Sequence, residues 1–135
     1  MKNFIKLTVY LLMIIFFLIT GCTLDRKNPL DPRGNSDIEE PMIISGFSVT
    51  TSNASVMLRW DKLDDIREYK VYRSLQYDGI YEYRLTATQI ESVSVIECIE
   101  NDVQIETYYY YKVSAVNKQG LEGKLCEPKG VRVKN

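Results

Sequence analysis

The sequence predicts an all-β protein whose folded part is a two-layer β-sandwich of seven short strands. From about residue 43 onward, short runs of alternating apolar and polar residues recur, rich in β-branched and aromatic types. Such runs are typical of half-buried strands. Turn-forming Asn, Asp and Gly residues separate them. The length of 135 residues suits one ordinary domain and leaves little room for a second.

Composition argues against several classes of function. Lys and Arg number 17 and Asp and Glu 18, so the net charge is -1. We expect no nucleic-acid partner, because the chain lacks the basic excess that binds a phosphate backbone. It also lacks histidine, the usual general base and the commonest metal ligand. Asp64 and Asp65 lie in a loop too poor in acidic side chains to hold calcium. We therefore predict that the protein is not an enzyme and needs no metal or cofactor.

The N-terminus has the pattern of a targeting segment. Lys2 and Lys6 give a positive start, and 13 uncharged residues follow from Leu7 to Ile19. A membrane-spanning helix needs about 20 apolar residues. This stretch is short for a span and suits the apolar region of a signal peptide.

The end of this segment carries a lipidation motif. Residues Leu18, Ile19, Thr20, Gly21 and Cys22 resemble the lipobox of bacterial lipoproteins. The resemblance implies that a signal peptide, residues 1–21, is removed and that Cys22 is acylated at its thiol and amino group. Two or three acyl chains anchor a protein effectively permanently. The expected location is the cell membrane or the outer membrane, with the domain outside the cytoplasm. The alternatives are an ordinary secretory signal with a chance cysteine, or an uncleaved anchor.

Residues 22–40 are expected to form the lipidated cysteine and a flexible linker. The stretch is rich in charged residues, contains Pro29, Pro32 and Gly34, and shows no apolar period. Such a segment cannot bury enough surface to offset its ordering entropy. The folded domain is then expected at 41–135.

Seven strands are expected in this domain, and that number in a domain of this length is typical of an immunoglobulin-like sandwich. Turns are expected at Thr51–Asn53, at Tyr77–Gly79 and at Asn117–Gly123. The expected strands are Ile43–Thr50, Ser55–Trp60, Glu68–Ser74, Tyr81–Ala87, Ser92–Cys98, Thr107–Asn117 and Lys129–Lys134.

Alternation within the strands assigns their faces. The residues expected to fill the core are Val56, Leu58, Trp60, Tyr69, Val71, Tyr109, Tyr111, Val113 and Ala115. Their neighbours, including Tyr72, Tyr108, Tyr110 and Ser114, are expected on the outer face. Tyr81 and Tyr83 share the parity of Leu85, so we expect them at the edge of the core.

Three motifs in order, Ser55–Asp61, Tyr69–Ser74 and Thr107–Asn117 with Gly120 after it, resemble a fibronectin type III domain. The resemblance covers about residues 41–134. As in that family, the tryptophan falls in the second strand, and no cysteine pair lies on the second and sixth strands. The resemblance implies a tyrosine corner at Tyr109, whose hydroxyl bonds backbone near the preceding turn. It also implies an adapter or spacer, often found beside carbohydrate-active enzymes.

The outward tyrosines are the best candidate for a binding face. Tyr72, Tyr108 and Tyr110 are expected on neighbouring strands, with Lys70, Lys112 and Arg73 nearby. Aromatic rings on an exposed sheet can stack against sugars or a partner protein. The alternative is that these rings only stabilise the sheet through cross-strand packing.

Two further cysteines, Cys98 and Cys126, could pair outside the cytoplasm. We expect them on different sheets, which favours free thiols over a disulfide.

The sequence thus predicts a membrane-anchored, non-catalytic fibronectin type III lipoprotein of the bacterial cell envelope. It would act as a protein-interaction or spacer module. The alternative is a glycan-binding surface lipoprotein that uses exposed tyrosines. The partners expected are the membrane, through covalent lipid, and an envelope protein or glycan that the sequence does not specify.

Overall fold

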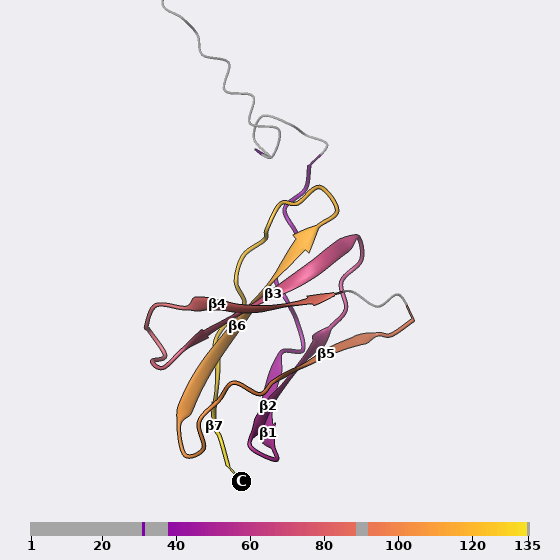
Figure 1. Cartoon of the computed structure of the whole chain (residues 1–135). Coiled ribbons are helices and arrows are strands. Elements are labelled where there is room, and N and C mark those ends of the chain that lie inside the picture. The colour runs from indigo at the N-terminus through magenta and orange to yellow at the C-terminus, as the bar shows by residue number, and fades with distance from the viewer. Residues whose placement is uncertain (1–30, 32–37, 89–91, 135) are drawn as a thin grey trace, which may run out of the picture.

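The computed structural model describes residues 31, 38–88 and 92–134, and its described part is all-β, as predicted. Figure 1 shows two layers of strands that face each other. The strands are β1 Ser48–Ser52, β2 Ser55–Asp61, β3 Ile66–Ser74, β4 Glu82–Thr88, β5 Val95–Glu100, β6 Tyr108–Asn117 and β7 Lys129–Arg132. None of the described residues lies in a helix long and apolar enough to cross a membrane.

The strands form one sheet of three strands, in the order β1-β2-β5, and one of four, in the order β4-β3-β6-β7. Every pairing is antiparallel. The chain therefore crosses between the layers after β2, after β4 and after β5. This places β3 and β6, which are distant in sequence, side by side at the centre of the larger sheet (Figure 1).

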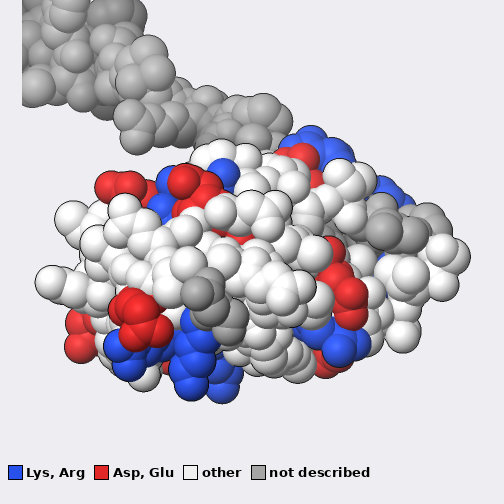
Figure 2. Space-filling view, turned by 60° about the horizontal axis from the view of Figure 1, so that its bottom comes forward, with Lys and Arg blue, Asp and Glu red and all other residues white. Residues whose placement is uncertain are grey.

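Charged side chains of both signs are intermixed on the surface. In the view of Figure 2, acidic residues lie next to basic ones around a broad uncharged area. Ion pairs such as Arg59 with Glu97, 2.9 Å apart, cross neighbouring strands. The face in view therefore presents a mixed charge pattern rather than a field of one sign.

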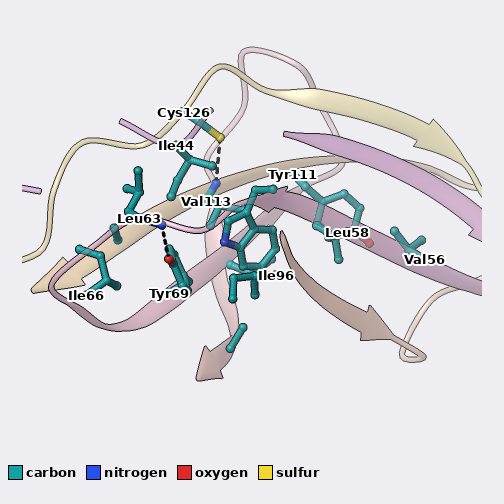
Figure 3. Packing of buried hydrophobic residues seen from close by; sticks show 14 of the residues in the cluster. Ile44, Val56, Leu58, Leu63, Ile66, Tyr69, Ile96, Tyr111, Val113 and Cys126 are labelled. Atoms are coloured by element: carbon teal, nitrogen blue, oxygen red, sulfur yellow. Dashed lines mark hydrogen bonds between the residues drawn. The ribbon is translucent and has the colours of Figure 1, made fainter. Parts of the chain in front are cut away.

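The core lies between the two sheets and is built from inward residues of the strands together with Ile44, Leu63, Cys126 and Val133, which lie outside the strands (Figure 3). All nine side chains predicted to fill it are buried. Trp60 of β2 is fully buried and meets Tyr69 of β3 across the gap, with their ring centroids 5.4 Å apart. Phe47 packs against the tryptophan from the same layer as β2, at 6.4 Å. The contact between Trp60 and Tyr69 couples the two sheets through aromatic packing.

The first strand begins later than predicted, at Ser48 rather than Ile43. Gly46 has a positive φ of 63°, and a Cβ there would lie 2.5 Å from a carboxylate oxygen of Asp61. The chain turns at this glycine, so the residues before it do not continue the strand. The prediction treated this apolar stretch as one run and missed the turn.

The turn after β1 also differs from the prediction. It falls at Asn53 and Ala54, both with positive φ, and Ser52 pairs with Ser55. Two central residues with positive φ make this a type I′ hairpin, whose twist matches that of the flanking strands. β5 likewise lies at Val95–Glu100 rather than at Ser92–Cys98, and its pairing with β2 runs from Val95 opposite Asp61 to Glu100 opposite Val56.

Residues 38–41 contact one pole of the sandwich. Ile38 is buried, and the Asn117 side-chain amide donates a hydrogen bond of 2.9 Å to the Glu39 carbonyl. In Figure 1 this pole lies at the top and the C-terminus at the opposite end. The described chain thus enters at one pole and leaves at the other.

Candidate functional site: an aromatic face on the four-stranded sheet

The predicted binding-face residues lie on one outer surface of the four-stranded sheet. Tyr72 of β3 pairs with Lys112 of β6 on one side and with Tyr83 of β4 on the other. Opposite residues of antiparallel strands point to the same face. Tyr110 and Tyr108 follow on the same face of β6, at intervals of two residues. Together with Tyr77 and Tyr81 of the β3–β4 connection, these tyrosines are called the aromatic face below.

A β-bulge brings Tyr83 to this face, against the prediction. The register between β3 and β4 steps from Val71 opposite Leu85 to Tyr72 opposite Tyr83, so that Arg84 is an extra residue. An extra residue reverses the alternation beyond it. Tyr83 is therefore exposed and meets Tyr72 edge to face at 6.0 Å. No sequence signal marked this bulge.

Ring contacts divide the aromatic face into two groups. Tyr72 and Tyr83 form one. In the other, the Tyr108 and Tyr110 rings are nearly parallel, with an interplanar angle of 24° and centroids 6.3 Å apart. Tyr77 stands almost perpendicular to Tyr110, at 87° and 5.8 Å. The ammonium group of Lys112 lies 4.6 Å from the centroid of the Tyr81 ring, a cation–π contact.

Glu122 fixes the end of the face next to Tyr72. It accepts hydrogen bonds from Lys70 at 2.7 Å, from Tyr72 at 2.6 Å and from Ser114 at 2.6 Å. Burial and the hydrogen bond to Glu122 raise the pKa of Tyr72 to about 12. Burial alone would raise the pKa of Glu122, but the hydrogen bonds from Lys70, Ser114 and Tyr72 lower it. Tyr72 and Lys70 are therefore held by an internal network, which the sequence did not reveal.

Besides Tyr83, two other predicted placements are wrong. Ser114 was expected to be exposed but is fully buried, because the chain after β6 folds back along the strand. Glu122 pairs there with Val116, and Cys126 N–H donates to the Val113 carbonyl. Arg73 was expected beside the aromatic face but points to the other side of the sheet. Its guanidinium carbon lies 4.7 Å from the centroid of the Tyr109 ring.

The five side chains singled out as structural, Leu58, Trp60, Val71, Tyr109 and Val113, are buried between the sheets. The Tyr109 hydroxyl accepts a hydrogen bond of 3.1 Å from Gln104 N–H. Gln104 lies in the turn between β5 and β6, which is the arrangement expected of a tyrosine corner.

Both cysteines of the sandwich are free thiols. Cys126 is buried, and its sulfur accepts a hydrogen bond from Val113 N–H at 3.2 Å (Figure 3). Burial raises the pKa of the Cys98 thiol to about 12 and also raises that of Cys126. In the part of the chain that the structure describes, no group of three or more His, Cys, Asp or Glu residues could hold a metal ion. The lipobox and Cys22 lie outside the described residues.

Comparisons with known proteins agree with this fold. The chain is similar to an Fn3-like protein from Clostridium thermocellum, with 23% identity, a TM-score of 0.59 and coverage of 72% of this chain and 97% of the other. It is also similar to the third fibronectin III domain of the human KIAA0343 protein, with 16% identity, a TM-score of 0.59 and coverage of 75% and 87%. The fold is thus that of a single fibronectin type III-like domain.

One curated relative is similar in sequence. Over 89 residues the chain is 30% identical to an amylopullulanase from Thermoanaerobacterium thermosulfurigenes. The match covers 64% of this chain but 4% of the length of that protein. It therefore concerns a small part of the amylopullulanase. No protein-family model matches the chain.

Proposed function

We propose that this protein is a membrane-anchored, non-catalytic module of the bacterial cell envelope that acts as a spacer or interaction domain. The observation that carries the proposal is a lipobox-like motif at residues 18–22 ahead of one fibronectin type III-like sandwich. This fold is consistent with a non-catalytic module. The proposed location is the cell membrane or outer membrane, with the sandwich outside the cytoplasm.

The direction of the chain supports the role of a spacer. Glu39 accepts a hydrogen bond at one pole of the sandwich, and the C-terminus lies at the other pole (Figure 1). A lipid at Cys22 would hold the first pole toward the membrane. The opposite pole, with the β1–β2 turn, would then point away from the lipid and be free to meet a partner.

Metabolic labelling with palmitate tests the anchor. We expect the full chain, expressed in a bacterium, to incorporate the label and to fractionate with membranes. Cys22→Ala should lose both properties, because the thiol that receives lipid is gone. Cys98→Ala is the matched control and should keep both. Label retained in Cys22→Ala would contradict the proposal.

Two observations support glycan binding as a second candidate function. Six tyrosines gather on the aromatic face, and the curated relative is named as an amylopullulanase. We propose a glucan as the ligand to test first. The full chain should then be retarded in native gels that contain pullulan or amylopectin, and equal mobility with and without these glucans would count against this function.

A further inference from the structure

We propose that Tyr108 and Tyr110 form a platform on which one sugar ring of a neutral glucan stacks, with Tyr77 as its wall. This inference rests on the second function proposed above and names the subsite. An aromatic ring presents an apolar face, and a pyranose ring presents C–H groups on its own faces. Two neighbouring rings of similar orientation therefore offer a larger stacking area than one.

The position of Tyr110 depends on a glycine. Gly130 of β7 lies opposite Tyr110 in the sheet. A Cβ at residue 130 would lie 2.6 Å from Cε1 and 2.7 Å from Cδ1 of the Tyr110 ring. The ring therefore lies over the space that a side chain would fill. Because Gly130 has no side chain, the Tyr110 ring can pack against the backbone of β7. The other side of the ring then points away from the sheet.

Tyr108 and Tyr77 complete the subsite. Tyr108 is 55% exposed and its ring is nearly parallel to that of Tyr110. Tyr77 is 52% exposed and stands perpendicular to Tyr110. The Tyr81 hydroxyl donates a hydrogen bond of 2.8 Å to the Tyr77 carbonyl. This bond stabilises the turn on which Tyr77 lies. Tyr110, between them, is half-buried, so the exposed Tyr108 and Tyr77 rings offer most of the area that a ring-shaped ligand would contact.

The charges around the subsite favour a neutral occupant. Arg132, opposite Tyr108, is paired with Glu106. Lys112 lies over the Tyr81 ring. Asp78 and Lys129, next in sequence to Tyr77 and Gly130, add opposite charges. An acidic polymer would find little net attraction at such a surface.

The other group of rings on the aromatic face gives the matched control. Tyr83 is 54% exposed, almost the same as Tyr108, and lies on the same sheet face. It meets Tyr72 edge to face at 74° rather than in parallel. Removing Tyr83 takes away an equally exposed tyrosine and leaves the platform in place.

Affinity electrophoresis of the full chain in detergent tests the inference, with pullulan, amylopectin and acidic polygalacturonate as probes. We expect binding to the neutral glucans, affinity about tenfold weaker in Tyr108→Ala, and unchanged affinity in Tyr83→Ala. Gly130→Ala keeps every tyrosine but displaces the Tyr110 ring, so it should weaken binding to a similar degree. Circular dichroism and an unchanged denaturation midpoint would show that each variant is folded.

The outcomes separate the subsite from the function. If wild type binds glucan and Tyr108→Ala or Gly130→Ala binds as well, the platform is wrong while glycan binding stands. If Tyr83→Ala loses as much affinity as Tyr108→Ala, or if polygalacturonate binds more tightly than the glucans, the inference is also overturned. If wild type binds none of the probes, glycan binding fails together with the subsite. The palmitate result for Cys22 is independent of all three.

Discussion

At the scale of single residues, buried hydroxyl groups hold connecting segments against the sheets. The Tyr69 hydroxyl accepts a hydrogen bond of 2.9 Å from Leu63 N–H (Figure 3), and burial raises the pKa of Tyr69. The Tyr109 hydroxyl does the same for Gln104 N–H. Each tyrosine thus fills the core with its ring and satisfies a backbone donor in a loop.

Replacing Tyr109 with Phe tests this role. The ring stays, but the hydrogen bond to Gln104 N–H is lost, so we expect a loss of about 1 kcal/mol in the free energy of unfolding. Urea denaturation followed by circular dichroism measures it. Tyr108→Phe is the control, because its side chain is exposed, and should change stability by less than about 0.5 kcal/mol. Equal midpoints for Tyr109→Phe and wild type would contradict the role.

At the scale of elements, two local irregularities shape the surface. The bulge at Arg84 turns Tyr83 outward and gives the aromatic face one of its rings. The β1–β2 hairpin turns through Asn53 and Ala54, with φ of 49° and 57°. Asn tolerates this left-handed conformation, whereas the Cβ of alanine makes it costly. The hairpin therefore keeps its register at the expense of strain at Ala54.

Ala54→Gly should relieve that strain. Glycine adopts positive φ freely but loses more backbone entropy on folding, so the expected net gain is about 0.5–1 kcal/mol. Chemical denaturation of the two proteins measures the difference. Ala87→Gly, in β4 where no positive φ occurs, should instead destabilise the domain by about 1 kcal/mol. A destabilised Ala54→Gly variant would show that the turn does not need positive φ there.

At the scale of the whole molecule, the two sheets are joined by a packed core and by a polar link at its edge. Glu100 of β5 is 4% exposed and accepts hydrogen bonds from Arg73 at 2.8 Å and from Arg84 at 2.9 Å. The hydrogen bond to Glu100, with a further one to Asp102, raises the pKa of Arg84. Both arginines belong to the opposite sheet, so the carboxylate ties the layers together where the apolar core ends.

Trp60→Ala should strongly weaken the packing between the two sheets. It removes the largest fully buried side chain and its contacts with Tyr69 and Phe47. The expected loss is about 3–5 kcal/mol, which is a large share of the stability of an ordinary domain. Thermal unfolding followed by far-UV circular dichroism measures it, since the chain has one tryptophan and its fluorescence disappears with the mutation.

Trp60→Phe provides the comparison. The indole nitrogen has no hydrogen-bond partner among the described residues, so a phenyl ring gives up volume but no hydrogen bond. We therefore expect a smaller loss than with alanine. Similar melting temperatures for Trp60→Ala and wild type would contradict the central role of this side chain.

The sequence by itself determined the all-β class, the number of strands and the central part of the core, whereas buried residues outside the predicted alternation, such as Ile44, Leu63 and Cys126, were not predicted. The predicted features follow from local alternation, because burial on one face of a strand leaves a period of two in the sequence. The buried set from Val56 to Trp60 and from Tyr109 to Ala115 shows this directly. Alternation also placed Tyr72, Tyr108 and Tyr110 on one outer face, since β3 and β6 are neighbours.

Only the tertiary structure decided which other side chains lie on that face and how they are held there. The bulge that exposes Tyr83 depends on the register between two strands. The burial of Ser114 and the network around Glu122 depend on where the chain returns after β6. The place of Tyr110 depends on a glycine in the partner strand. Each is set by contacts between residues far apart in sequence, and a local pattern carries no record of which distant backbone will lie beside it.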